Sequence, residues 1–326
     1  MKIIGIGNAL LDVLIRLEHD RALTEAGIRK GAMDLIDEAQ MSAIQKGQAG
    51  LERSEVPGGS CCNVMRAMAR LGAAVGYIGK VGNDRIGKAY EEDMLKSGVK
   101  SHIIRTSGVS GCSTVLISPD GERTMATFLG LAATLSDDEI ADVMLQPYDC
   151  LYLEGYLIAN EALFLPVLQR AKRMGLKVAL DLSNFNIVNG FRELLQEVVP
   201  EYVDILFSNE SEAKAFTGLP AVDAIDVIAD QVEIAVVTVG KHGVWVKKRD
   251  TKIHEAATGS RVVDTTGAGD NFAAGFLYGY SRDASLVQSA QIGSLLSGNV
   301  IETVGAQVQE GRWSQIKLKI DAILRE

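Results

Sequence analysis

Residues 262–276 read VVDTTGAGDNFAAGF, and this stretch says more about the chain than any other. An apolar run ends at a Gly-Ala-Gly turn, and small and aromatic residues then recur at helical spacing. Glycines let a ligand approach the backbone without interference from a Cβ atom. The amides of Gly267, Ala268 and Gly269 are expected at the start of a helix, where the helix dipole favours anions. The pattern therefore predicts an anion-binding turn.

Asp270 follows this turn and lies in the first turn of the predicted helix. A carboxylate beside an anion site repels the anion unless another group lies between them. A hydroxyl nucleophile fits that gap, since Asp270 can accept its proton while the amides bind a transferring phosphoryl group. Alternatively, Asp270 only stabilises its helix as a first-turn acid. The length of the surrounding pattern favours the role of catalytic base.

The composition of the 326 residues limits the other possibilities. The length suits one large α/β domain with an accessory piece, or two domains. A net charge of −9 argues against nonspecific nucleic-acid binding. The chain has four cysteines, of which Cys61 and Cys62 are adjacent, so we expect no disulfide framework and a cytoplasmic location. The sequence contains no run of about eighteen apolar residues, so we expect no membrane span.

Short β-branched runs alternate with amphipathic stretches, which predicts a mostly parallel sheet covered by helices. We expect strands at Ile3–Gly7, Val75–Ile78, Cys150–Leu153, Lys177–Leu180, Ile205–Ser208 and Ile234–Val239. We expect helices at Cys62–Leu71, Arg85–Lys96, Glu161–Met174, Glu210–Phe216, Ala268–Tyr280, Val287–Ile301 and Ser314–Leu324.

Two segments, residues 14–55 and 102–128, interrupt this alternation. The first contains a helix-like stretch, Leu35–Gln48. In the second, a turn at Pro119-Asp120-Gly121 separates two strand-like runs, which predicts a hairpin ending at Phe128. The two segments either form one small β-rich lid or are unrelated surface excursions.

The 262–276 stretch resembles the C-terminal signature of the ribokinase-like (PfkB) carbohydrate and nucleoside kinases. The resemblance implies an α/β, ribokinase-like three-layer sandwich with a central mostly parallel sheet. Its core would comprise residues 1–13, 56–101 and 129–326, and the two segments above would form the lid. It also implies that Asp270 is the catalytic base, that Gly267–Gly269 is the anion hole, and that ATP with Mg²⁺ is the phosphoryl donor.

Two more segments resemble parts of the family that bind the acceptor. Residues 57–63, PGGSCCN, resemble its N-terminal Gly-Gly signature, in which Gly58 and Gly59 bring backbone close to a polyol. Asn63 offers both a donor and acceptors to vicinal hydroxyls. Residues 5–12, GIGNALLD, resemble its first strand, in which Asn8 and Asp12 bind substrate. The alternatives are a permissive turn before a helix and an exposed acid at a strand end.

The nucleotide and metal contacts come from the same resemblance. Asn209 and Glu212 match an Asn-x-x-Glu element associated with Mg²⁺, which would be bound through its water shell. Without the family, a helix-capping Asn209 is the better interpretation. The resemblance also implies that Thr238 and Gly240 contact the nucleotide and that the backbone carbonyls of Asp264 and Thr266 bind K⁺. It further implies that Arg123, in the lid, reaches the transferred phosphate; the alternative is a surface arginine.

The separation between Asp12 and Gly58 favours the adenosine-kinase branch, with adenosine as first acceptor and ribose or fructose as second. Leu10, Tyr156 and Phe185 either form apolar walls around a purine or belong to the core. The expected partners are ATP and this acceptor, without nucleic acid or membrane, in a monomer or homodimer. Adenine contacts stay open, because Gly293 and Ser294 stand where many ribokinases carry Asn.

Other classes fit the sequence less well. A dinucleotide-dependent oxidoreductase needs a third glycine at position 10, where Leu10 stands, and a P-loop kinase needs a Walker motif that the chain lacks. A non-catalytic, ligand-binding relative of the kinases would usually have lost its base, whereas Asp270 is present.

Overall fold

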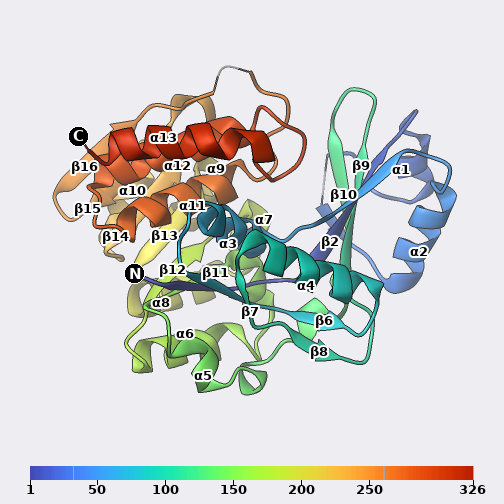
Figure 1. Cartoon of the computed structure of the whole chain (residues 1–326), viewed down its shortest axis with the longest axis horizontal. Helices are drawn as coiled ribbons and strands as arrows, with labels where there is room; N and C mark the ends of the chain where they lie inside the picture. The colour runs from blue at the N-terminus through green and yellow to red at the C-terminus, as the bar shows by residue number, and fades with distance from the viewer. Residues whose placement is uncertain (32, 260, 326) are drawn as a thin grey trace.

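The computed structural model describes residues 1–31, 33–259 and 261–325 (Figure 1). Its large sheet has the strand order β16-β15-β14-β13-β12-β11-β1-β5-β7. The strands are β1 (Ile3–Ile6), β5 (Val75–Ile78), β7 (Lys100–Ser101), β11 (Cys150–Glu154), β12 (Lys177–Asp181), β13 (Ile205–Asn209), β14 (Ile234–Thr238), β15 (Val244–Lys248) and β16 (Thr251–Glu255). Pairing is parallel from β7 to β14 and antiparallel through β15 and β16. The mostly parallel sheet is confirmed.

Helices cover both faces of this sheet, because its strands are apolar on both sides. In β1, Ile3 packs into one hydrophobic cluster, whereas Ile4 and Ile6 pack into the other. The first cluster includes α3 (Ser60–Arg70), α4 (Arg85–Ser97), α11 (Ala268–Tyr280), α12 (Leu286–Val300) and α13 (Trp313–Ile323). The second includes α5 (Asp142–Leu145), α6 (Phe164–Arg173), α7 (Phe185–Gly190), α8 (Arg192–Tyr202), α9 (Glu210–Thr217) and α10 (Ala221–Ala229). The expected three layers are confirmed (Figure 1).

A smaller sheet stands beside this sandwich, with the order β3-β10-β9-β2-β4. It is built from β2 (Leu10–Arg16), β3 (Met33–Leu35), β4 (Arg53–Pro57), β9 (Gly111–Ile117) and β10 (Arg123–Phe128). Leu11, Val13 and Ile15 are buried in a cluster with residues of α1 (Arg21–Glu25) and α2 (Glu38–Gly47), which cover the outer face. The alternate residues of β2, among them Leu10 and Asp12, face the sandwich. Figure 1 shows the two helices on the far side of this sheet.

The remaining elements are short. Strands β6 (Lys80–Gly82) and β8 (Ile104–Thr106) pair with each other. Five 3₁₀ turns are described in the resolved ranges: η1 (Gly130–Thr134), η2 (Asp137–Glu139), η3 (Gly155–Ala159), η4 (Gly240–His242) and η5 (Glu310–Arg312).

The predicted hairpin is present as β9 and β10, whereas the predicted helix Leu35–Gln48 is too long at its start. Leu35 ends strand β3, and the helix begins only at Glu38. The reason is Asp37, whose side chain accepts a hydrogen bond from the amide of Gln40 at 2.7 Å and caps the helix there. The division into core and lid at residues 14, 55, 102 and 128 stays a prediction. Strand β2 runs across the first of these positions, and residues 32, 260 and 326 lie outside the described ranges.

Candidate active site

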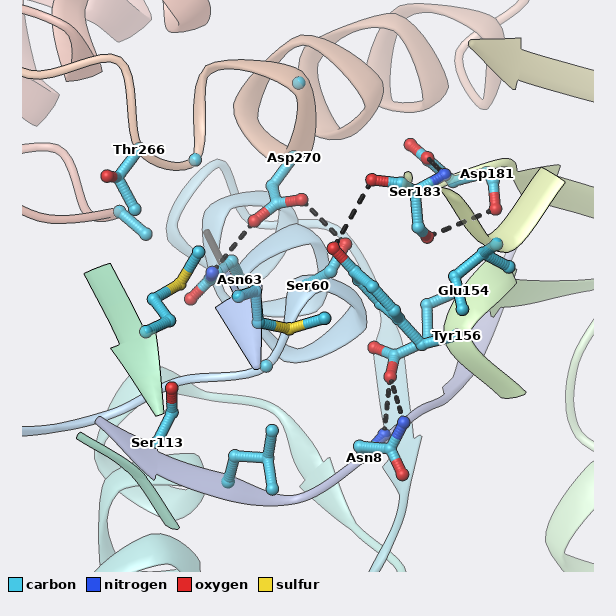
Figure 2. Close-up of a pocket in the computed structure, with 18 of the residues that line it drawn as sticks. Asn8, Ser60, Asn63, Ser113, Glu154, Tyr156, Asp181, Ser183, Thr266 and Asp270 are labelled. Carbon is cyan, nitrogen blue, oxygen red and sulfur yellow. Dashed lines mark hydrogen bonds between the residues drawn. The ribbon is translucent and has the colours of Figure 1, made fainter. Parts of the chain in front are cut away.

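A cavity of about 450 Å³ lies between the two sheets, at the carboxyl ends of the parallel strands. Open α/β sheets bind their ligands at this edge. The large sheet and its helices contribute polar residues such as Glu154, Asp181 and Asp270. The small sheet contributes Asp12 and a set of mostly apolar side chains. Figure 2 shows Asp270, Asn63 and Ser60 at the centre of this cavity.

The turn before α11 has a fixed backbone. Gly267 has a φ of +73°, and a Cβ atom added there would lie 2.6 Å from Cβ of Ala306. The side-chain amide of Asn271 donates to the carbonyl oxygens of Gly267 at 2.9 Å and Ala306 at 3.0 Å. The amide of Ala268 donates to the carbonyl of Thr265 at 3.2 Å. Of the three predicted amide donors, those of Gly267 and Gly269 are therefore the better candidates for a ligand.

Asp270 points into the cavity from the first turn of α11 (Figure 2). One carboxylate oxygen accepts a hydrogen bond from the Ser60 hydroxyl at 2.7 Å, and the other accepts one from the Asn63 amide at 2.9 Å. Burial raises the pKa of Asp270 above its usual value, while the two donors lower it. The predicted base and the predicted substrate ligand Asn63 are thus brought together, at the N-terminal turn of α3.

Asp12 lines the same cavity from the inner face of β2. Burial raises the pKa of its carboxyl group to about 7, and the positive charge of Arg66 opposes this shift. Gly58 lies against Asp12, and its amide donates to the carbonyl of Leu10 at 2.8 Å. Gly59 has a φ of +94°, and a Cβ atom there would overlap the carbonyl oxygen of Asn8. The Gly-Gly turn therefore joins the first strands to α3, and contact of Gly58 and Gly59 with a polyol stays a prediction.

Asn8 is engaged with a buried acid that the sequence analysis did not single out. Its backbone amide and its side-chain amide both donate to one oxygen of Glu154 at 2.8 Å. The other oxygen of Glu154 accepts the backbone amide of Cys61 at 2.9 Å. Burial raises the pKa of Glu154 to about 7. Asn8 lines the cavity, but its donor is directed at Glu154 (Figure 2).

Asn209 and Glu212 form a capping box at the start of α9. The Glu212 carboxylate accepts two hydrogen bonds from Asn209: one from its backbone amide at 2.8 Å and one from its side-chain amide at 2.7 Å. Burial raises the pKa of Glu212 to about 7, and burial together with the Glu212 charge raises the pKa of Asp181 strongly. Both acids line the cavity. These two carboxylates repel each other, and a hard divalent cation, which prefers oxygen ligands, would relieve this repulsion.

Arg123 extends from β10 to the loop before the anion-binding turn. Its guanidinium forms an ion pair with Asp264 and donates to the Thr266 hydroxyl at 2.9 Å. Asp264 also accepts from the backbone amides of Thr266 at 3.0 Å and Gly305 at 2.6 Å. Arg123 and Asp264 line a second cleft of about 1010 Å³, between the small sheet and the segments 262–266 and 304–307. Arg123 thus connects the small sheet directly to the loop before Gly267. Contact of Arg123 with a phosphate stays a prediction.

The remaining predicted residues separate into two groups. Leu10, Tyr156 and Thr238 line the central cavity. Phe185 is half-exposed, and neither it nor Gly240 is among the lining residues in the described part of the chain.

The similarities of the chain agree with this geometry. Residues 32–311 match the pfkB family carbohydrate kinase domain. The chain belongs to the PfkB kinase family. A curated protein of Archaeoglobus fulgidus described as an uncharacterized sugar kinase is 30% identical over 242 residues, 74% of this chain and 96% of that protein. The adenosine kinase of Sinorhizobium meliloti has a TM-score of 0.87 at 30% identity, over 98% of this chain and 99% of that one. A probable sugar kinase from Rhizobium etli has a TM-score of 0.88 at 29% identity, over 98% of both chains.

As a PfkB-family member, the chain is a sugar or nucleoside kinase, a phosphotransferase that acts on an alcohol group, and the family implies ATP as phosphoryl donor. In the described ranges, no helix combines the length and the apolar character needed to cross a bilayer.

The polar residues of this PfkB-family site that sequence reasoning missed include Ser60, Glu154 and Asp181. Glu154 and Asp181 are the last residues of the neighbouring strands β11 and β12. The signal was available, because acids at the carboxyl ends of adjacent parallel strands meet at one edge of the sheet. Ser60 had no comparable signal, since its partner Asp270 lies 210 positions away.

Proposed function

We propose that this kinase transfers the γ-phosphoryl group of ATP to the hydroxymethyl group of a nucleoside, with adenosine favoured and Asp270 as the base. One observation carries the choice of acceptor. The small-sheet side of the cavity is mostly apolar: Leu10, Met33, Leu35, Met125 and Leu129 line it, together with the hydroxyls of Ser113 and Thr127, which hydrogen-bond to each other at 3.0 Å. Asp12 and Asn63 line the same cavity and are suited to bind ribose hydroxyls.

The chemistry of the two acceptor classes explains why this wall matters. A free sugar carries hydroxyls around its whole ring, and each one loses its water on entering an apolar compartment without gaining a partner. A nucleoside places its hydroxyls at one end and, at the other, a flat base whose two faces can stack on apolar side chains. The apolar wall beside a polar floor supports the nucleoside.

The reaction would use the residues as follows. Asp12 and Asn63 bind the vicinal hydroxyls and thereby place the acceptor hydroxyl beside Asp270. Asp270 accepts the proton as the new O–P bond forms, and the amides of Gly267 and Gly269 bind oxygens of the transferring group. Ser60, which donates to Asp270 at 2.7 Å, keeps that carboxylate oriented until the acceptor arrives.

Asn209, Thr238 and Gly240 are proposed to contact the nucleotide. The carboxylates of Glu212 and Asp181 would bind Mg²⁺ through its water shell, where the ion would neutralise charge on the phosphates. The carbonyl groups of Asp264 and Thr266 are proposed to bind K⁺, and a comparison of kcat in Na⁺ and K⁺ at constant ionic strength tests this assignment.

A sugar kinase is the second candidate. The polar floor formed by Asp12, Asn63 and Glu154 offers hydrogen-bonding groups that a furanose can use. The Archaeoglobus and Rhizobium relatives described as sugar kinases also favour it.

An ADP-release assay of the purified protein against a panel of nucleosides and sugars distinguishes the two. The proposal expects the highest kcat/KM for adenosine or another nucleoside, and loss of that activity in Asp270→Asn. A higher kcat/KM for ribose or fructose would make the protein a sugar kinase. No turnover with any acceptor, despite ATP binding, would identify a ligand-binding relative that has lost catalysis.

A further inference from the structure

Arg66 is a buried arginine that lies directly behind the catalytic residues. It is on α3, one helical turn after Asn63, and only 4% of its side chain is exposed. A buried guanidinium requires partners for its donors. Its Nε lies 2.8 Å from Oδ2 of Asp93 on α4, and one Nη donates to the carbonyl of Pro57. The other Nη donates to Oδ1 of Asn63 at 3.4 Å.

The last of these contacts determines which way the Asn63 amide faces. Asn63 lies between the guanidinium of Arg66, which can only donate, and the carboxyl group of Asp270, whose Oδ2 accepts from the Asn63 amide. The amide therefore directs its oxygen at Arg66 and its NH₂ group at Asp270, where it donates at 2.9 Å. Rotation of the amide by 180° would place donor against donor and acceptor against acceptor. Arg66 thus keeps the NH₂ group of Asn63 on the catalytic carboxylate.

Arg66 also acts on the acceptor side of the cavity. Three charged groups bear on Asp12 in its buried position: Arg66 from α3, Asp270 from α11 and Arg123 from β10. Arg66 is the stronger of the two cations, and it favours the ionised form of Asp12 against burial and against Asp270. Arg66 therefore acts on Asp12 through its charge alone, whereas it contacts the Asn63 amide directly.

We propose that Arg66 is a positioning residue for phosphoryl transfer: it fixes the Asn63 amide so that this amide donates to Asp270. The role needs the planar, multi-donor shape of arginine. A lysine supplies the charge but, as a point donor, cannot serve Asp93, Pro57 and Asn63 together. Charge and shape can therefore be separated by mutation.

A purely structural role is the alternative, in which Arg66 serves only to neutralise the partly buried Asp93. The double variant Arg66→Met/Asp93→Asn separates the two, because it removes both charges and leaves no uncompensated carboxylate. Arg70→Met is the matched control: Arg70 is one turn further along α3 and pairs with Glu310 at 3.0 Å on the surface.

The first test rests on the proposed function and uses the acceptor from the panel that the wild type phosphorylates best. We expect kcat to fall on the order of tenfold or more in Arg66→Met, in the double variant and in Arg66→Lys. Arg70→Met should match the wild type. A wild-type kcat in the double variant would overturn the proposal.

A second measurement needs no acceptor and decides the point even if the proposed function fails. Protein labelled with ¹⁵N-asparagine reports the Asn63 side-chain amide, which is assigned as the signal missing in Asn63→Ala. In the wild type and in Arg70→Met we expect its NH₂ protons to be shifted downfield and protected from solvent exchange. In the double variant they should move to the values of a free amide. An unchanged Asn63 signal in a folded double variant would exclude Arg66 as the group that orients it.

Discussion

The two sheets border one cavity but contribute opposite kinds of side chain to it. The large sheet and its helices supply carboxylates, amides and the glycine turn: Glu154, Asp181, Glu212, Asp270 and Gly267–Gly269. The small sheet supplies a mostly apolar wall with one acid, Asp12, and the hydroxyls of Ser113 and Thr127. Under the proposed function, this difference gives phosphoryl transfer to the large sheet and selection of the acceptor to the small one. Mutations on the two sides should therefore change different kinetic constants.

The largest effect is expected on the large-sheet side, for Asp270→Asn. Asn has the same shape as Asp and can make similar contacts, but it cannot act as a base. We therefore expect kcat to fall by a factor of roughly 10²–10⁴. ADP release measures the rate, and calorimetry with ATP shows whether the nucleotide still binds. A variant that keeps more than half of the wild-type rate, with its fold intact by circular dichroism, would remove Asp270 from its proposed role.

Asp12→Ala tests the small-sheet side and should act on the acceptor. Loss of a hydrogen-bonding partner for buried hydroxyls costs about 1–3 kcal/mol, which raises the acceptor KM roughly 5- to 150-fold. The KM for ATP should change little, because Asp12 belongs to the opposite sheet. If both constants rise equally, the division of labour between the two sheets is wrong.

Met125→Ala sharpens the comparison within the small sheet itself. Met125 lines the cavity from β10 and is 36% exposed, so the fold should tolerate its truncation. Loss of apolar contact with a base should raise the KM for adenosine by about tenfold or less. The KM for ribose should not change, since a sugar that occupies only the polar floor does not reach this wall. Leu95→Ala, an exposed site on α4, is the control.

The sequence predicted the large sheet far better than the small one, and the reason is the range of the interactions. Helix α11 occupies the predicted span Ala268–Tyr280, because its turn, its first-turn acid and its apolar spacing are all local signals. In the small sheet, Leu10 of β2 pairs with Gly111 of β9, about a hundred residues away. No local pattern specifies that register.

The same distinction holds within the site. Asp270 and Gly267–Gly269 were found from a contiguous motif, whereas Arg66 gives no signal in its own segment. Its proposed role follows from the contacts that it makes with Asp93 of α4 and with Asn63 on its own helix. Burial of a charge is a property of the folded chain, and spacing along the sequence does not reveal it.

The smallest expected effect concerns stability and comes from Glu154, which lies between the two sheets. Burial raises its pKa from 4.5 in the unfolded chain to about 7. Between these values the folded state binds a proton that the unfolded state does not, so the free energy of unfolding falls as the pH rises through this window.

The wild-type Tm should therefore be higher at pH 6 than at pH 8, by about 2 °C or more. Because burial also raises the pKa values of Asp12 and Glu212 to about 7, Glu154→Gln should reduce this slope without abolishing it. Glu92→Gln, at an exposed position of α4, should leave the slope unchanged. Scanning calorimetry at pH 6, 7 and 8 and constant ionic strength measures all three proteins, and an equal slope in Glu154→Gln would show that Glu154 is already ionised beside Asn8 and Cys61 at pH 6.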